Sequence, residues 1–438
     1  MLRKIVILVC FVLFVPCMVF AAPEVKRYGN DGFTIKDAIT DEFIAWIKAE
    51  KGQIKSGKLE FRVDNITDAE LSLLCSTFPE MTYLNVAKGR QITTLEPLTK
   101  LKALRSLVLD DFVVRDMTPL AGLTGLEYID IDCDFVMPDL KWMSGMTKLN
   151  NIRIENHGYQ GGSLTSFEGL PNLPIKQIYF NGSGIKITDL TPLVNAMPNL
   201  QKLNLQNISL TDLTPLTKLA NLSELYLYGA KLGDFTPLAK CAKLRILEYY
   251  AVKGADFSTL GKLTQVEEFQ GGLTALDDIS WMAQLPNLKK LRLFAEYVTD
   301  YSPLTKTNIK HLTIWQMKKP VGDLAFLGEM KSLTYLRLWM LQDVTNFEVI
   351  GSLPSLEELI LMEVNSKTGE AIDLGFISKL QNLKTLDLTN NTKIAGLDNP
   401  KVLDGIKKLP KLTSLAVTKD TFTEEHLSGF PESVRIRK

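Results

Sequence analysis

The chain has 438 residues, enough for two or three ordinary domains or for one long array of repeats. Its 50 basic residues equal its 50 acidic residues, so the overall charge gives no support to electrostatic binding of nucleic acid. Apolar residues make up 45% of the chain, which is ordinary for a folded protein.

Residues 1–21 have the three parts of a secretory signal peptide: a basic start, an apolar run over 5–20 and small residues at the end. We expect cleavage after Ala21. The alternative is an uncleaved membrane anchor, but an apolar run interrupted by Pro16 is short for a span that needs about 20 residues. The sequence therefore predicts a secreted protein or one of the periplasm or cell envelope, without a membrane span after signal cleavage.

Cleavage leaves Cys75, Cys133 and Cys241. Three cysteines are few for a chain of this length, and an odd number cannot all pair, so we expect no disulfide framework. Cys241 stands where the preceding repeat has Leu219, so we expect it to be a small apolar core residue. A reactive thiol is the alternative.

Residues 22–55 are predicted to form an N-terminal helical cap. Within them, residues 40–51 place Phe43, Ile44, Trp46 and Ile47 on one amphipathic helix.

Residues 56–418 repeat the pattern Leu-x-x-Leu-x-Leu. Fifteen clear copies begin 21 to 29 residues apart, most often 22, and a weaker copy with Leu59 and Phe61 precedes them. The fourth and sixth positions of each copy, such as Leu203 and Leu205, point to one side of a strand because they lie two residues apart. One unit cannot bury that side alone, so successive units must stack into a parallel sheet with a continuous core.

The return path of each repeat is marked by pairs such as Thr214-Pro215. Threonine at an N-cap followed by proline is typical of a helix start, and the chain then returns through a Leu-x-Asn-Leu segment such as 219–222. Strands lie ~4.8 Å apart and helical turns need more room. We therefore expect an α/β fold: a curved solenoid with parallel strands on the concave face and short helical or 3-10 turns on the convex face.

The combined pattern, Leu-x-x-Leu-x-Leu followed by Asp-Leu-Thr-Pro-Leu and Leu-x-Asn-Leu, resembles the leucine-rich repeats of the SDS22-like class, as in bacterial internalins. The resemblance implies a horseshoe that binds proteins on its concave sheet. Internalin repeats usually carry an Asn three residues after the last strand leucine, where its amide bonds neighbouring coils. Only Asn391 conforms, and the slot elsewhere holds residues such as Phe112, Ile208, Ala230 and Val252. We therefore expect these turns to satisfy their backbone groups differently.

The second, fourth and sixth residues after each first leucine are predicted to face the concavity. The last of these rows is acidic early, at Asp110, Asp132 and Glu155, and aromatic from the middle of the array. Exposed strand positions have no folding reason to collect aromatic rings, so we predict an interaction surface. The alternative is that the rings fold over the strand ends and pack on adjoining turns. The predicted partner-binding residues are Tyr226, Tyr228, Tyr250, Arg292, Phe294, Trp315, Tyr335, Arg337, Trp339 and Met362.

The acidic run is predicted to be a solvated face and not a calcium site, because calcium takes six to eight oxygens and these carboxylates stand at least a strand apart. Residues 419–438 are predicted to form a C-terminal cap, with a short helix starting at Thr423 and a last strand at Val434 and Ile436.

The three histidines lie far apart and no catalytic or phosphate-binding motif is present, so we expect no enzyme, no cofactor and no metal. The favoured function is an exported adhesin, host-interaction factor or envelope scaffold that binds a protein partner, with no nucleic acid. The alternative is a carbohydrate-binding surface built on Trp and Tyr. The absence of cysteine-rich caps favours a bacterial source.

Overall fold

The structure is a computed structural model that describes most of the residues between 24 and 438. The predicted signal peptide lies outside them, as do Ile208 and Val252. Within the described part of the chain, no helix has the length and apolar character needed to cross a membrane. The described residues are 24–28, 32–36, 38–51, 58–133, 139–156, 166–181, 187–206, 210–230, 232–251, 257–273, 276–315, 319–365, 371–391, 393–397, 399–419 and 421–438.

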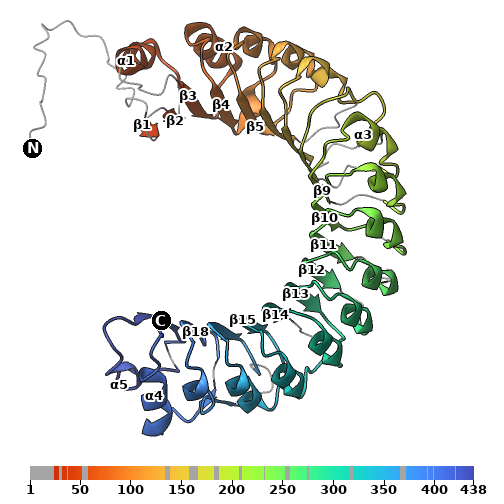
Figure 1. Cartoon of the computed structure of the whole chain (residues 1–438). Coiled ribbons are helices and arrows are strands. Elements are labelled where there is room, and N and C mark those ends of the chain that lie inside the picture. The colour runs from red at the N-terminus through yellow and green to blue at the C-terminus, as the bar shows by residue number, and fades with distance from the viewer. Residues whose placement is uncertain are drawn as a thin grey trace, which may run out of the picture.

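The chain forms a horseshoe, with strands along its inner side and helical turns along its outer side (Figure 1). One sheet contains 19 strands among the described residues, and the strands follow one another in chain order. β1 is antiparallel to β2, and every later pair in this sheet is parallel. The predicted fold class, a curved leucine-rich repeat solenoid, is confirmed.

The strands of this sheet are β1 (Glu24–Tyr28), β2 (Gly32–Lys36), β3 (Glu60–Asp64), β4 (Tyr83–Ala87), β5 (Ser106–Phe112), β6 (Tyr128–Cys133), β7 (Asn151–Asn156), β8 (Gln177–Asn181), β9 (Lys202–Gln206), β10 (Glu224–Tyr228), β11 (Ile246–Ala251), β12 (Glu268–Leu273), β13 (Lys290–Ala295), β14 (His311–Trp315), β15 (Tyr335–Trp339), β16 (Glu358–Met362), β18 (Thr385–Asp387), β20 (Ser414–Ala416) and β21 (Arg435–Arg437). A separate pair joins β17 (Ile372–Asp373) to β19 (Ile394–Ala395).

Short helices lie between the strands. The α-helices are α1 (Asp41–Lys51), α2 (Asp68–Thr77), α3 (Thr191–Ala196), α4 (Pro400–Lys407) and α5 (Glu424–Leu427). The 3-10 helices are η1 (Gly89–Gln91), η2 (Glu96–Lys100), η3 (Thr118–Gly122), η4 (Lys141–Gly145), η5 (Thr214–Lys218), η6 (Thr236–Lys240), η7 (Ser258–Lys262), η8 (Ser280–Gln284), η9 (Ser302–Lys306), η10 (Ala325–Glu329), η11 (Phe347–Ser352) and η12 (Ile377–Lys379).

The core is the stack of leucines that the repeat pattern predicts. Leu225 and Leu227 of β10 are fully buried, and each lies beside its counterpart in β9, Leu203 and Leu205. In β10 the alternate residues Glu224, Tyr226 and Tyr228 are only half-buried, because successive side chains of a strand point to opposite faces. The buried side chains form a single cluster that runs from Phe33 to Val434.

The 3-10 helices start differently from the prediction. Thr214 is already the first residue of η5, and its backbone N–H donates to the Asp212 carboxylate at 2.8 Å. The aspartate two residues earlier, and not the threonine hydroxyl, therefore caps the turn. The same bond is made before other 3-10 helices by Asp116, Asp234, Asp278 and Asp300, and before the short α-helix α3 by Asp189.

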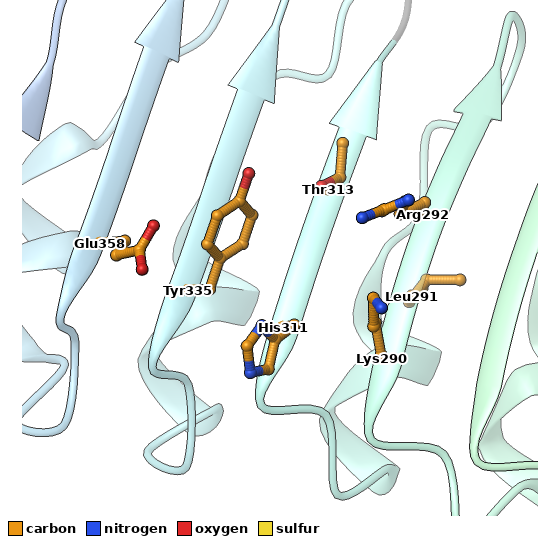
Figure 2. Close-up of a pocket in the computed structure, with 7 residues that line it drawn as sticks. All are labelled: Lys290, Leu291, Arg292, His311, Thr313, Tyr335 and Glu358. Carbon is orange, nitrogen blue, oxygen red and sulfur yellow. The ribbon is translucent and has the colours of Figure 1, made fainter. Parts of the chain in front are cut away.

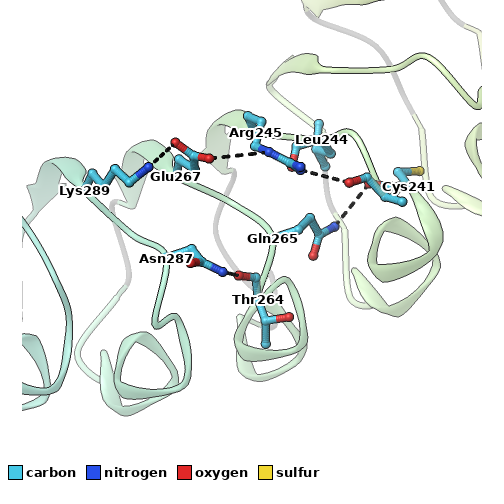
Figure 3. A network of polar contacts seen from close by, with 9 residues as sticks. Cys241, Leu244, Arg245, Thr264, Gln265, Glu267, Asn287 and Lys289 are labelled. Atoms are coloured by element: carbon cyan, nitrogen blue, oxygen red, sulfur yellow. Dashed lines mark hydrogen bonds and ion pairs between the residues drawn. The ribbon is translucent and has the colours of Figure 1, made fainter.

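The segments that lead back into the strands also join adjacent coils (Figure 3). Glu267 pairs with Arg245 at 3.4 Å on one side and with Lys289 at 2.7 Å on the other. The Asn287 amide donates to the Thr264 carbonyl of the preceding coil at 2.8 Å. The asparagine of the Leu-x-Asn-Leu segment thus acts as a link between coils.

The sheet extends into the segment assigned to the N-terminal cap. β2 is parallel to β3 and buries Phe33 and Ile35, so it belongs to a further coil, and β1 covers its outer edge. The predicted amphipathic helix is α1, which buries Phe43 and Ile47 but leaves Trp46 41% exposed. At the other end, Thr423 caps α5 and β21 pairs with β20, where the sequence places a short helix and a last strand.

Two buried asparagines, Asn391 and Asn365, bond the backbone of the turns that follow the strands. Asn391 is buried and its amide donates to the carbonyls of Leu361 and Leu388, as the sequence predicts. Asn365, which the pattern missed, is equally buried and exchanges hydrogen bonds with the Val344 backbone. Positive φ angles at Glu363 and Asn365 show an irregular turn that shifts this asparagine one position from the expected slot.

All three described cysteines are buried, and the Cys133 thiol donates to the Glu155 carbonyl at 3.6 Å. The Cys241 thiol donates to the Leu216 carbonyl at 3.5 Å, and burial raises its pKa to about 11. It is a core residue, as predicted.

Candidate functional site: the concave aromatic row

The sheet register brings the predicted aromatic side chains into one line. Tyr228 pairs with Tyr250, then come Gly272, Phe294, Trp315, Trp339 and Met362 on successive strands from β10 to β16. All these residues are half-buried. At ~4.8 Å per strand the line is about 29 Å long. We call Tyr228, Tyr250, Phe294, Trp315 and Trp339 the aromatic row.

The tyrosine end of the row is closely stacked. The rings of Tyr228 and Tyr250 are 4.7 Å apart and only 9° from parallel. The Tyr250 ring then reaches Phe294, two strands away, at 6.0 Å. Gly272 lies between them in register, and a Cβ there would collide with the Tyr250 ring. The glycine therefore keeps the row continuous.

The tryptophan end is packed more loosely. The Trp315 ring lies 5.7 Å from Phe294 and 5.9 Å from Trp339. The Trp315 indole N–H donates to the Met340 sulfur at 3.0 Å, and the Arg337 guanidinium lies 4.7 Å from the centre of the Trp339 ring. The rings therefore pack mainly on one another. The sequence also left open that the rings could pack on adjoining turns, and of these contacts only the one between Trp315 and Met340 is of that kind.

A series of hydrogen bonds connects the side chains of Tyr228, Glu248, Gln270 and Tyr250. The Tyr228 hydroxyl donates to Glu248, and the Gln270 amide donates to Glu248 at 2.8 Å and to the Tyr250 hydroxyl at 2.6 Å. Burial, followed by the bond to Glu248, raises the pKa of Tyr228 well above its ordinary value. The hydroxyls therefore stay protonated, and these hydrogen bonds hold the two rings in position.

Tyr226, also predicted to bind a partner, lies in the neighbouring row. Its hydroxyl donates to Glu224 at 2.8 Å, and the Lys202 ammonium lies 4.8 Å from its ring centre. Lys202 and Glu224 are themselves paired at 3.0 Å. Tyr226 is thus part of a local network at the edge of the aromatic row.

A hollow of about 280 Å³ lies on the concave face toward the amino ends of β13–β16. Figure 2 shows Lys290 and Arg292 from β13, His311 and Thr313 from β14, Tyr335 from β15 and Glu358 from β16 around it. The rings of His311 and Tyr335 are stacked 5.7 Å apart, and Thr313 is buried at the floor. Of these residues, only Arg292 and Tyr335 are among the partner-binding residues predicted from the sequence. Thr313 carries no signal by itself, because its role depends on the register of the neighbouring strands.

Two carboxylates in the acidic half of the concave face, those of Asp130 and Glu155, are paired with Arg153. Arg153 contacts Asp130 at 3.4 Å and also pairs with Glu155. Burial, then the charges of Asp132 and Asp111, raise the pKa of Asp110. Among the described residues, no group of three or more His, Cys, Asp or Glu side chains is arranged to hold a metal ion.

Two leucine-rich repeat family models match the chain. A model of leucine-rich repeats in two copies matches residues 198–240, and the Zer-1-like leucine-rich repeat model matches residues 324–433. No curated protein sequence matches the chain.

Among solved structures, an internalin, InlF, from Listeria monocytogenes is 21% identical, with 81% of this chain and 90% of that one covered and a TM-score of 0.49. The LRR protein LIC12759 of Leptospira interrogans is 17% identical over 92% of this chain and 93% of its own, with a TM-score of 0.46. TLR13, in a complex with ssRNA13, is 14% identical over 86% of this chain and 59% of its own, with a TM-score of 0.49.

Stacked coils with one strand and one short helical turn each, together with the family models, define the chain as a leucine-rich repeat protein. Its coils of most often 22 residues, with a strand and a 3-10 turn opened by Asp-x-Thr-Pro in the best copies, carry the pattern by which the sequence resembles internalin repeats.

Proposed function

We propose that this leucine-rich repeat protein is exported and binds a protein partner through the concave aromatic row, without catalysing a reaction. The observation that supports the partner site is the row itself: five aromatic side chains in register, half-exposed, on a face that the fold does not need to be aromatic. Aromatic residues and arginine supply most of the binding energy in protein interfaces. A row about 24 Å long, or about 29 Å with Met362 of β16 included, suits an interface of the usual ~800 Å² per partner.

The ring orientations favour a protein over a carbohydrate. Sugars stack on the faces of aromatic rings, but the facing sides of Tyr228 and Tyr250 cover each other. Arg337 lies over the Trp339 ring. Much of the ring surface in the row is thus already covered, which suits apolar side chains of a protein partner better than a flat sugar.

Photo-crosslinking tests the proposal. p-Benzoylphenylalanine in place of Phe294 is expected to crosslink to a polypeptide in cells that produce the chain, and the crosslink is expected to disappear when Trp315→Ala and Trp339→Ala are added. The same crosslinker at Trp46, an exposed ring on α1 outside the row, is the matched control. Crosslinks of equal strength at both positions, or to glycan alone, would count against the proposal.

Export is tested separately on the whole chain. Signal cleavage predicts that the protein recovered outside the cytoplasm begins at Ala22, which N-terminal sequencing reads directly. A chain that retains Met1 and stays in the cytoplasm would remove the exported part of the proposal and leave the partner site standing.

A further inference from the structure

We infer that the partner presents an acidic side chain, aspartate or glutamate, to the Arg292 side of the hollow in Figure 2, next to an apolar side chain on the aromatic row. This inference rests on the proposed function and names the chemistry of the partner.

The lysines and arginines on the concave face of β7–β15 fall into two groups. Arg153, Lys202 and Lys290 each form a salt bridge with a neighbouring carboxylate, at 3.4, 3.0 and 2.8 Å. Arg292 instead donates to the neutral Gln270 amide oxygen at 3.1 Å, and Arg337 lies over a tryptophan ring. Within the described parts of the chain, no salt bridge neutralises Arg292 or Arg337.

These two arginines flank the hollow's floor. Arg292, Thr313 and Arg337 are paired in register on β13, β14 and β15, so the small, buried Thr313 lies between two long cationic side chains. Arg292 is exposed, and Lys290 and His311 line the same side of the hollow. Glu358, the one carboxylate among the lining residues, is three strands from Arg292.

The position next to the aromatic row sets the spacing of the partner's groups. Arg292 is two residues before Phe294 on the same strand, which places the two side chains ~7 Å apart on one face. Neighbouring side chains on one face of an extended segment, or one turn apart on a helix, have about this separation. A guanidinium binds a carboxylate through two parallel hydrogen bonds, which makes an acidic group the matching occupant.

Phage display on the immobilised chain, with a library of random twelve-residue peptides as the probe, tests the inference. The peptides enriched on the wild-type protein are expected to carry Asp or Glu close to Trp, Phe or Leu, and to be lost on a Trp315→Ala protein. Arg292→Glu is expected to weaken a selected peptide by roughly 10- to 100-fold and, in a fresh selection, to enrich Lys or Arg at the acidic position. Arg115→Glu, the same charge change at an exposed position in the loop before η3, is expected to change neither.

The outcomes separate the two claims. Peptides that depend on Trp315 but carry no acidic residue and bind Arg292→Glu unchanged would overturn the acidic partner and leave the aromatic site. If no selected peptide depends on Trp315, both fail. Heparin serves as an anionic glycan probe: if heparin binding depends on Arg292 and no acidic peptide is enriched, the occupant is a glycan and the inference is wrong.

Discussion

Tyr249 shows how one residue replaces the missing asparagine of a turn. Its ring lies in β11 and is fully buried. Its hydroxyl accepts a hydrogen bond from the Leu232 N–H at 3.2 Å and donates one to the Ala230 carbonyl at 3.0 Å. The hydroxyl thus reaches the preceding turn from inside the core and satisfies both backbone groups.

Tyr249→Phe is therefore expected to lower the free energy of unfolding by about 1–3 kcal/mol, because it leaves a buried N–H and a buried C=O without partners. Urea unfolding followed by circular dichroism measures the change. Tyr335→Phe is the matched control, since that half-buried residue lies on the concave surface. Equal stability of Tyr249→Phe and the wild type would show that the hydroxyl is not needed by the turn.

Gly272 has a corresponding role in the aromatic row. A Cβ at this position would occupy the space of the Tyr250 ring, which packs across the glycine toward Phe294. Gly272→Val is expected to displace Tyr250 and so to break the row between its tyrosine and tryptophan ends. Partner or peptide binding is expected to weaken by about tenfold, because one aromatic contact of ~1–1.5 kcal/mol is lost. Near-ultraviolet circular dichroism reports the ring environment. Unchanged spectra and binding would show that the row does not depend on this glycine.

At the scale of the single element, the short helices that begin with an Asp cap give the stability of the convex side a dependence on pH. Hydrogen bonds from the side chain and backbone of the residue two positions on lower the pKa of Asp116, Asp189, Asp234 and Asp300 below the ordinary 3.8. The unfolded state therefore binds more protons than the folded state just below that value. This contribution to stability is present above pH 3.8 and is lost as the pH falls through the lower, folded pKa values.

A chain with all four aspartates changed to asparagine is expected to keep most of its stability at pH 7, because the amide oxygen still accepts the bond, and to lose less stability on acidification. Urea midpoints at pH 7 and pH 3 give the comparison. Glu432→Gln, at an exposed position, controls for the removal of one charge. If the fourfold variant loses as much stability as the wild type between the two pH values, the turn carboxylates do not cause the acid sensitivity.

The elements also show what the sequence could predict. The apolar alternation predicted the strands because a core position needs only an apolar side chain at the right spacing. It missed the coil of β2, where Phe33 and Ile35 stand without the leading leucine of the pattern. It missed Asn365, because an irregular turn moves that residue by one position. The line of aromatic residues followed from the repeat register, but the ring directions depend on neighbours such as Gly272 that a spacing pattern does not contain.

At the scale of the whole molecule, each coil contacts mainly the coils beside it, although the core is one continuous cluster. Such an array behaves as a line of units coupled to their nearest neighbours. Damage to one central coil is therefore expected to open the chain locally and to leave distant coils folded.

Leu227→Ala in β10 tests this. Leu227 is fully buried between Leu205 of β9 and Tyr249 of β11, and the lost side chain is expected to cost about 2–5 kcal/mol. Hydrogen exchange measured by mass spectrometry is expected to accelerate in β9–β11 while β4 and β16 keep their protection. Leu227→Met, which nearly conserves volume, is the control and is expected to cost less than about 1.5 kcal/mol. Equal acceleration in all strands would mean that the horseshoe unfolds as a single cooperative unit, because a central coil would then be unable to open without the ends.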